Sequence, residues 1–378
     1  MRLVFATVFE YPHPGGLSTH VDMLSAALLR RGHEVSFATP RRISPVRLEL
    51  VARAPSVLLQ ALGGDRGRIW SHRERLRILT QGLARLPKDQ IVIAEDVLAA
   101  IAAKRAGLPC LLTVHGYLTR EALSRRGMLE GSLGQRYFER MEREGYLAAG
   151  RIVTVDHRLK EHVLTVSGRG DARVQPNFID TAWALGLPPR DDSRTALGLG
   201  QVPVILCPRR LTPKNGVHVA VAAMAYLPHA VLLVVGDGAE SDSLQSQAAG
   251  LDLGDRVRFE GAKPHAGMAQ YYAAADAVVV PSVPVAGVEE ATSISVLEGM
   301  ASGRPVVASA IGGLRELITP GENGLLVPPD DPRALAHAVR EALSDAGPAL
   351  GRAAQDYVAR HHSADAAAEA FEDDLSAL

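Results

Sequence analysis

Two glutamates separated by seven residues stand in the second half of the chain. Glu290 lies in a polar loop after the apolar run 277–280, and Glu298 lies within an apolar-periodic helix predicted to begin near Ser295. Backbone N–H groups at such a helix N-terminus bind anions. A carboxylate such as Glu298, inside an apolar helix face, would be costly to bury without a partner. The pattern therefore predicts an anion site between two carboxylates, and these carboxylates would accept hydrogen bonds from sugar hydroxyls.

Three cations follow another predicted strand. Arg209, Arg210 and Lys214 come directly after the apolar run 204–207. Arginine offers a planar fork of donors and lysine a point charge, and together they suit a diphosphate. Ligands bind at the carboxyl ends of parallel strands, so we expect a phosphate site rather than solvated side chains.

Two glycine pairs follow predicted strands as well. Gly15 and Gly16 precede a helical pattern, and Gly236 and Gly238 flank Asp237. Glycines there permit close backbone approach to a ligand. A simple tight turn explains Gly15-Gly16 equally well, and a glycine-rich strand-to-helix turn is the favoured interpretation of Gly236 and Gly238. The dinucleotide fingerprint would need a third glycine where this chain has Ser241, which disfavours a nicotinamide enzyme.

The elements that must position these residues are short β-branched runs alternating with helical patterns, as in parallel sheets built from βαβ units. The predicted strands of the first half are Leu3–Val8, Val35–Thr39, Ile91–Glu95, Leu111–His115 and Ile152–Asp156. Residues 181–201 show no clear period and are predicted to be a linker. The predicted strands after it are Val204–Cys207, Val231–Val235, Val257–Phe259, Ala277–Val280, Pro305–Ser309 and Leu325–Val327.

The charge balance excludes one class of partner and suggests another. The chain has 41 Lys and Arg against 42 Asp and Glu, so we expect no nucleic acid. The first 178 residues hold 27 basic and 17 acidic side chains, and the remainder holds 14 and 25. The arginine-dense stretch at Arg66, Arg68, Arg73, Arg75 and Arg77 is either a solvated helix face or a docking surface for anionic lipid or a phosphorylated acceptor.

Cysteine and motif usage bear on compartment and cofactors. Cys110 and Cys207 lie in apolar runs and are predicted to be buried thiols in a reducing compartment. No apolar run reaches the ~18 residues of a membrane span, so we expect a cytoplasmic protein. No D-x-D, C-x-x-C or H-E-x-x-H motif occurs, and no metal or other cofactor is expected. His13, His20 and His33 are predicted to be turn or surface residues.

The spacing of Glu290 and Glu298 resembles the E-x7-E signature of glycosyltransferase family 4, whose members are retaining enzymes with the GT-B fold. Further motifs of that family follow in the same order along nearly the whole chain. They are Gly15-Gly16, Arg31-Gly32-His33-Glu34-Val35, Thr113-Val114-His115-Gly116, Gln175-Pro176-Asn177, Gly236-Asp237-Gly238, Tyr271-Tyr272-Ala273-Ala274-Ala275-Asp276, Gly312-Gly313 and Glu322-Asn323-Gly324-Leu325-Leu326-Val327.

The resemblance implies roles for single residues. Glu290 would contact the donor sugar, Glu298 the nucleotide ribose, and His115 would lie beside the donor sugar near the reaction centre. The candidate catalytic residues are His115, Glu290, Arg209 and Lys214. The candidate donor- or nucleotide-binding residues are Gly15, Gly16, Arg210, Gly236, Glu260, Gly261, Ala262, Thr292, Ser293, Ile294, Ser295 and Glu298.

Three departures from the family pattern stand out. Thr292-Ser293 replaces the usual Phe-Gly after the first glutamate, which affects the fit of the donor sugar. Asn215 intervenes between Lys214 and Gly216, where the family places glycine directly after lysine, so either Arg209 or Arg210 is the phosphate ligand. Phe178-Ile179-Asp180 replaces a frequent Gly-Val-Asp near the linker.

The resemblance implies an α/β fold of GT-B type, with two Rossmann-like parallel-sheet domains facing a central cleft. We expect an N-terminal acceptor-side domain over 1–180, completed by a C-terminal helix at about 358–378 that crosses back to it. A linker over 181–201 and a nucleotide-sugar-binding domain over 202–357 complete the expected organisation.

The sequence is identified as that of a retaining, metal-independent glycosyltransferase of hexosyltransferase type. It is expected to move a sugar from a nucleoside-diphosphate sugar to an acceptor hydroxyl by a front-face mechanism. The acceptor is a small molecule, a glycan or a lipid-linked sugar, with peripheral contact at the inner membrane face as an open hypothesis. A nucleotide-sugar 2-epimerase of the same fold and a catalytically silent sugar-nucleotide-binding protein are the alternatives.

Overall fold

The computed structural model describes residues 1–12, 16–61, 65–124, 130–285 and 289–378. The described chain divides into two compact units. Unit 1 comprises residues 1–176 and 365–378, and unit 2 comprises residues 177–285 and 289–364. Each unit is built around its own sheet and is described by itself.

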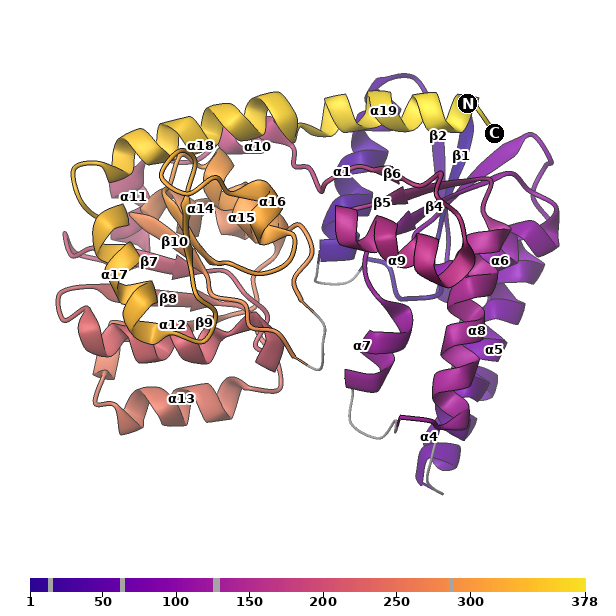
Figure 1. Ribbon diagram of the computed structural model, residues 1–378, viewed down its shortest axis with the longest axis horizontal. Coiled ribbons are helices and arrows are strands. Elements are labelled where there is room, and N and C mark those ends of the chain that lie inside the picture. The colour runs from indigo at the N-terminus through magenta and orange to yellow at the C-terminus, as the bar shows by residue number, and fades with distance from the viewer. Residues whose placement is uncertain (13–15, 62–64, 125–129, 286–288) are drawn as a thin grey trace. The chain divides into compact units, whose positions relative to one another are not determined.

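Within its described residues, unit 1 contains a parallel sheet of six strands in the order β2-β1-β3-β4-β5-β6 (Figure 1). These strands are β1 (Arg2–Ala6), β2 (Glu34–Ala38), β3 (Gln90–Ala94), β4 (Cys110–Val114), β5 (Arg151–Thr154) and β6 (Arg173–Val174). All five strands predicted from apolar runs are present, each within two residues of its predicted limits. The sequence does not predict β6, because two half-buried residues at a sheet edge leave no apolar run.

Three of the longer helices of unit 1 begin at side-chain caps. The side chains of Asp96, Ser132 and Asp156 accept hydrogen bonds from the first turns of α6, α8 and α9. The helices are α1 (Gly16–Arg30), α2 (Pro40–Ile43), α3 (Pro45–Arg47), the π-helix η1 (Leu48–Arg53), α4 (Ala54–Ala61), α5 (Arg66–Leu83), α6 (Val97–Ala106), α7 (Leu118–Ser124), α8 (Leu133–Ala148), α9 (His157–Ser167) and α19 (Ala364–Ser376). The described part of residues 40–87 is therefore mostly helical.

Within its described residues, unit 2 also contains six parallel strands, in the order β12-β11-β10-β7-β8-β9. They are β7 (Val204–Cys207), β8 (Val231–Val235), β9 (Val257–Gly261), β10 (Ala277–Val280), β11 (Val306–Ser309) and β12 (Leu325–Val327). Every strand of this sheet is predicted by the sequence. From β7 the next strands, β8 and β9, are added on one side of the sheet, and the later strands β10, β11 and β12 are added on the other side. The strand order therefore reverses between β7 and β10, and ligands bind at such reversals in open α/β sheets.

The helices of unit 2 cover both faces of its sheet. They are α10 (Thr181–Leu185), α11 (Arg190–Ala196), η2 (Pro213–Asn215), α12 (Val217–Ala223), η3 (Met224–Tyr226), α13 (Ser241–Gly250), η4 (Gly254–Arg256), α14 (His265–Ala274), α15 (Ile294–Ala301), α16 (Leu314–Leu317), α17 (Pro332–Ala342) and α18 (Gly347–His361).

The segment 181–201 holds α10 and α11, where the sequence predicts a linker. Arg194 of α11 is 2% exposed, pairs with Asp276 and donates to the carbonyl oxygen of Ala274 at 3.1 Å. These bonds attach α11 to the end of α14 within unit 2. An apolar period does not reveal this contact, because the buried side chain is an arginine.

The C-terminal helices divide between the units. Helix α18 packs against α15, with the Gln355 amide donating to the carbonyl oxygen of Ala301 at 2.8 Å. Helix α19 belongs to unit 1, where Arg30 pairs with Asp365 at 2.7 Å and Arg31 with Glu372 at 2.6 Å. The return of the C-terminal helix to the first domain is thereby confirmed. None of the described helices is both long and apolar enough to cross a membrane.

Candidate functional site

The carboxyl edge of the unit 2 sheet brings together residues from the loops after β7 and β10. Arg209 follows β7, and its guanidinium is buried, with 7% of the side chain exposed. Its Nη1 donates to Ser293 Oγ at 3.2 Å, and its Nη2 lies 2.7 Å from Asn215 Oδ1, 3.0 Å from Ser282 Oγ and 2.9 Å from Glu290 Oε2. Arg209 therefore joins the loop after β7 to the loop after β10, which carries Glu290.

Glu290 keeps its negative charge in this setting. Its side chain is 16% exposed, and burial alone would raise the pKa of the carboxyl group. The positive charges of Arg209 and Lys214, with hydrogen bonds from Arg209 and Ser282, outweigh burial and hold the pKa of Glu290 below its usual value. The carboxylate is ready to accept hydrogen bonds at neutral pH.

The other two cations of the loop are exposed. Arg210 and Lys214 reach the surface, whereas Asn215 is buried and donates from Nδ2 to the carbonyl oxygen of Arg210 at 2.7 Å. Asn215 thus occupies the position directly before Gly216, where the family places its lysine. The geometry separates a buried guanidinium that holds Glu290 from two exposed cations that are open to an anion.

The N-terminus of α15 lies next to this pair. Ser293 is the residue before the helix, and no side chain caps the first turn. Its hydroxyl is used by Arg209 instead, and Ser295 Oγ donates to the carbonyl oxygen of Pro208 at 2.9 Å. Since neither Ser293 nor Ser295 caps this turn, the first N–H groups of α15, from Ile294 onward, are suited to an anionic ligand.

Thr292 joins this loop to the rest of unit 2. Its Oγ1 accepts from the backbone N–H of Asn177 at 3.1 Å, and its carbonyl oxygen accepts from Asn177 Nδ2 at 2.6 Å. A Cβ on Gly313 would lie 2.6 Å from the Thr292 nitrogen, so glycine is needed for the close approach of that turn. Thr292 and Ser293, which replace the family's Phe-Gly, thus each make hydrogen bonds within unit 2.

Glu298 is held by aromatic neighbours. It is buried on α15, and its Oε2 accepts from the Tyr272 hydroxyl at 2.7 Å. Its Oε1 lies 2.9 Å from His265 Nε2, and the His265 ring lies against Trp183 with centroids 5.3 Å apart. The His265 side chain is 43% exposed, so His265 lies between the buried Glu298 carboxylate and solvent.

The remaining predicted residues of unit 2 lie around this edge. Gly236 is packed so closely that a Cβ would lie 2.0 Å from the carbonyl oxygen of Arg209, which makes it part of the support of the Arg209 loop. Glu260 accepts from the Tyr271 hydroxyl at 3.0 Å and pairs with Arg258. Gly261, the last residue of β9, and Ala262 after it are exposed.

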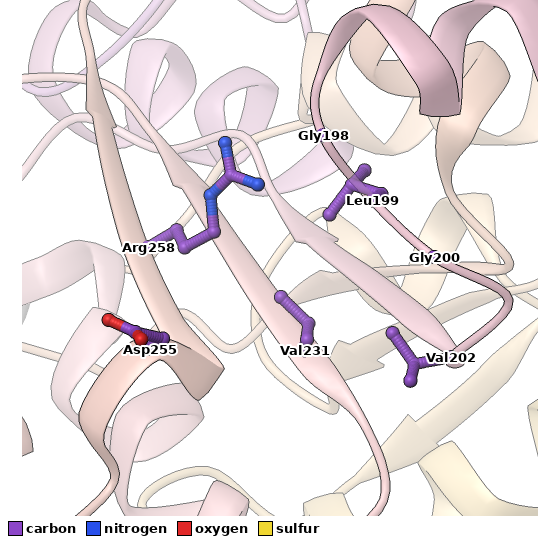
Figure 2. Close-up of a pocket in the computed structure, with 7 residues that line it drawn as sticks. All are labelled: Gly198, Leu199, Gly200, Val202, Val231, Asp255 and Arg258. Atoms are coloured by element: carbon purple, nitrogen blue, oxygen red, sulfur yellow. The ribbon is translucent and has the colours of Figure 1, made fainter.

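A cavity of about 380 Å³ in unit 2 has none of these predicted residues in its lining. Figure 2 shows its lining, with Val231 at the start of β8 and Arg258 on β9. Val202 and Asp255 also line it and precede β7 and β9, which places the cavity at the amino ends of the strands. It contains none of the predicted site residues, so we assign the site to the carboxyl edge.

Unit 1 contributes one predicted catalytic residue. His115 follows β4, and its Nε2 lies 2.7 Å from Oε2 of Glu95, which follows β3. The ring of His20 on α1 meets the His115 ring edge-on with centroids 4.7 Å apart. His20 is buried, so its prediction as a turn or surface residue is wrong.

The other predicted residues of unit 1 are His13, Gly15, Gly16 and His33. Gly16 is the exposed first residue of this helix, and Gly15 and His13 lie outside the described residues. His33 pairs with Glu372 of α19 at 2.6 Å and is a packing residue. The second ring nitrogen of His33 lies 3.0 Å from the N-terminal nitrogen of Met1, and Arg31 also pairs with Glu372, so the polar partners of His33 fix α19 to unit 1.

Within the described ranges, the metal-type cluster is His20, Glu95 and His115, whose donor atoms lie within 4.8 Å of one another. Nitrogen and carboxylate donors suit a divalent transition metal. However, Glu95 and His115 already bond to each other at 2.7 Å. That bond occupies Oε2 of Glu95 and Nε2 of His115, and we assign a shared proton to these two atoms.

Several neighbours of the site escape sequence reasoning. Glu95 and Ser282 carry no motif, Asn215 is noticed only as a departure from the family pattern, and His265 precedes a family motif without belonging to it. Their one common signal is position, since each ends or follows a predicted strand of an α/β unit, where ligand sites gather. Position alone selects too many residues to identify these four.

Comparisons with known proteins agree with this geometry. A model described as Glycosyltransferase Family 4 matches residues 14–183, and one described as Glycosyl transferases group 1 matches residues 189–361. Glycogen synthase of Mycobacterium tuberculosis is 30% identical over 388 residues, covering 93% of this chain and 88% of that protein.

Two further matches span the chain. D-inositol 3-phosphate glycosyltransferase 1 of Catenulispora acidiphila is 28% identical, covering 88% of this chain and 83% of that protein. The structure of sucrose-phosphate synthase from Thermosynechococcus elongatus superposes with a TM-score of 0.79 at 26% identity, covering 100% of both chains. The chain therefore belongs to glycosyltransferase family 4, and it is a glycosyltransferase with the GT-B fold.

Proposed function

We propose that this glycosyltransferase moves a hexose from a nucleoside-diphosphate sugar to an acceptor hydroxyl, with retention and without a metal ion. The observation that supports this most is the Arg209–Glu290 pair at 2.9 Å, beside the uncapped N-terminus of α15. A carboxylate for sugar hydroxyls and an anion site for a diphosphate are thereby adjacent within one unit.

The chemistry that this arrangement supports is stabilisation of a leaving group. When the sugar–phosphate bond breaks, negative charge grows on the diphosphate, and fixed donors that face it lower the barrier. Lys214, Arg210 and the first N–H groups of α15 are the available donors, while Arg209 holds Glu290 in place. In the front-face mechanism that the family implies, the leaving phosphate oxygen accepts the acceptor's proton on the same face.

A nucleotide panel tests this proposal. Thermal shifts with UDP, GDP and ADP and their hexose conjugates, in the presence of EDTA, are expected to show stabilisation by one nucleotide series. Release of the free nucleoside diphosphate then separates a transferase from a silent binding protein. A nucleotide-sugar 2-epimerase would instead return the donor with an inverted C2 centre, detectable by NMR. Stabilisation that requires a divalent metal would contradict the metal-free assignment.

The names of the relatives do not indicate a single class of acceptor. The matched proteins are named for a polyglucan and for an inositol phosphate, so the family's acceptors differ widely. We propose an acceptor that is a small molecule, a glycan or a lipid-linked sugar. The buried free thiols Cys110 and Cys207 suit the reducing cytoplasm, where nucleotide sugars are made.

Peripheral contact with an anionic membrane is part of the proposal, and α4 and α5 support it. Arg66, Arg73 and Arg77 on α5 are exposed. Val57 and Leu58 on α4, which packs against α5, are 67% and 68% exposed. Exposed cations beside exposed apolar side chains suit a lipid surface. Arg75, by contrast, donates to the carbonyl oxygen of Val8 at 3.0 Å and is a structural residue.

Vesicle co-sedimentation tests this contact. A triple change of Arg66, Arg73 and Arg77 to Gln is expected to abolish binding to anionic vesicles at low salt. The matched control changes three exposed arginines of unit 2, namely Arg340, Arg352 and Arg360. Binding should also fade near 1 M salt, where the Debye length falls to about 3 Å. Equal loss in both variants would point to net charge rather than to this surface.

A further inference from the structure

A buried carboxylate without a sequence motif lies at the carboxyl edge of the unit 1 sheet. Glu95 follows β3, and β3 pairs with β1, so the residue stands where the strand order of this sheet reverses. Its side chain is 1% exposed, and its backbone N–H donates to the carbonyl oxygen of Ala6 at 2.9 Å. Ligand sites gather at such reversals, which makes Glu95 a candidate for a role beyond packing.

The two oxygens of this carboxylate are in unequal positions. Oε2 is bonded to His115 Nε2 at 2.7 Å, whereas Oε1 is buried without a hydrogen-bond partner among the described residues. An unmatched buried carboxylate oxygen is costly. Residues that keep such a cost are concentrated at functional sites.

Glu142, a second buried glutamate of the same unit, differs from Glu95 in having hydrogen-bond partners at both carboxylate oxygens. Four groups bond to Glu142: Leu118 N–H at 3.1 Å, Thr119 Oγ1 at 2.7 Å, Tyr146 OH at 3.1 Å and His162 Nε2 at 3.0 Å. Burial raises the pKa of Glu142, but its bonds to His162, Thr119 and Tyr146 lower it below the usual value. Glu142 is a charged structural residue.

Glu95 behaves in the opposite way. Burial raises its pKa to about 7 and lowers the pKa of His115 to about 4. Between these values the two side chains hold two protons, one on the carboxyl group and one on the ring. Near neutral pH the pair therefore loses a proton while the ring stays uncharged.

We propose that Glu95 is a positioning residue that sets the tautomer of His115, and thereby decides whether Nδ1 of that ring donates or accepts a hydrogen bond. When Glu95 is protonated, its O–H donates to Nε2 and the ring proton is on Nδ1, which is a donor. When the pair loses one proton, the Glu95 proton moves to Nε2 and the Nδ1 proton leaves to solvent. Nδ1 is then an acceptor.

The titratable groups around Glu95 and His115 do not move the proton loss of this pair away from neutral pH. The facing titratable groups are Tyr11 after β1, His20 on α1, Asp96 after β3 and Cys110 on β4. Burial raises the pKa of Tyr11 above its usual value and that of Cys110 to about 12. Asp96 accepts from Thr7 Oγ1 and from the N–H groups of Val8 and Ala99. The charge of His20 lowers the pKa of Glu95.

This inference rests on the proposed function only for what Nδ1 meets, which would be a hydroxyl of the donor sugar. The tautomer itself is a property of the protein alone. Ring-nitrogen NMR of histidine-labelled protein between pH 5.5 and 8.5 measures it directly, with the His115→Gln spectrum as assignment. We expect the ring proton to move from Nδ1 to Nε2 with a midpoint near pH 7.

Three variants make the experiment decisive. Glu95→Gln should abolish the midpoint, and Glu95→Asp should restore a titration. Glu142→Gln, the matched control, should lower the melting temperature and leave the His115 signals unchanged. A midpoint that persists in Glu95→Gln, a doubly protonated ring in this pH range, or one equivalent of metal in the purified protein would overturn the proposal.

Kinetics supply a separate readout once a donor is known. The acidic limb of the kcat profile should fall near pH 7 in the wild type and be absent in Glu95→Gln, while Glu142→Gln keeps it. A silent enzyme with an intact tautomer switch would contradict the proposed function and leave the Glu95 inference standing. An active enzyme without the switch would do the reverse.

Discussion

Two buried glutamates stand at corresponding places in the two units, near the point where each strand order reverses. Glu290 in unit 2 is paired with a guanidinium, and its pKa lies below the usual value because Arg209 and Lys214 outweigh burial. Glu95 in unit 1 is paired with a neutral imidazole, and burial raises its pKa to about 7. A cationic partner fixes the charge of a buried carboxylate, whereas a neutral partner leaves it able to exchange a proton.

The largest expected effect comes from removing the cation. Arg209→Met leaves the Glu290 carboxylate without its buried partner, and losing one member of such a pair costs about 3–5 kcal/mol of unfolding free energy. The double variant Arg209→Met, Glu290→Gln removes both charges and should cost less than the sum of the single changes. Urea unfolding measures all three variants. Additive losses would show that the two side chains do not interact.

The pH dependence of stability should have opposite signs in the two units. The folded state binds an extra proton at Glu95 between its reference pKa of 4.5 and about 7, so this group destabilises the fold as pH rises through that window. The full difference is about 3 kcal/mol, from 1.36 kcal/mol for each pKa unit. Glu95→Gln should therefore gain stability over the wild type at pH 8 and not at pH 4.5.

Glu290 supplies the contrasting case. Because its pKa is lowered from 4.5, its contribution to stability is present at neutral pH and is lost as the pH falls through the folded-state value. Glu290→Gln should flatten the acid side of the stability curve, and unfolding free energies from pH 3 to 8 would show it. A curve that stays parallel to that of the wild type would mean that Arg209 does not hold this charge.

A smaller effect is expected at Glu298, whose partners are Tyr272 and His265. If it binds the nucleotide ribose, Glu298→Gln should weaken donor and free nucleotide alike by about 1–3 kcal/mol, the value of a hydrogen bond to a charged group. Tyr272→Phe keeps the carboxylate and removes its internal bond at 2.7 Å, which makes it the matched control. Unchanged nucleotide affinity in calorimetry would exclude the assignment.

The smallest effect concerns Lys214, which is exposed and free of the internal bonds of Arg209. Lys214→Ala should lower kcat about tenfold, or about 1.4 kcal/mol, with a smaller change in donor affinity, since charge on the diphosphate grows in the transition state. Stability should not change. Equal losses in kcat and donor affinity would indicate ground-state binding, and Arg210→Ala provides the comparison.

The sequence predicts the sheets well, because their central strands are continuous apolar runs that only a buried parallel strand explains. It misses β6, whose two residues are half-buried, and the helical segment 181–201, whose anchor is the buried Arg194. Both exceptions depend on polar or edge contacts rather than on apolar periodicity.

The candidate site divides in the same way. Motif spacing identifies Glu290, Glu298 and the cations, since they lie in one stretch or next to one strand. It does not identify the pairing of Glu95 with His115, because the two residues are 20 positions apart and meet only when β3 and β4 pair. Nor does it separate Arg209 from Lys214, whose difference is burial in the folded loop.

We propose that the charged Glu290 carboxylate and the cations around it support retaining transfer without a metal. Proton NMR of the reaction with the donor selected by thermal shift, in the presence of EDTA, tests it most directly. The account predicts release of the nucleoside diphosphate, a product with the anomeric configuration of the donor, and loss of turnover by about 100-fold in Glu290→Gln, for about 3 kcal/mol. An inverted anomer, a requirement for added metal, or full activity of Glu290→Gln would contradict it.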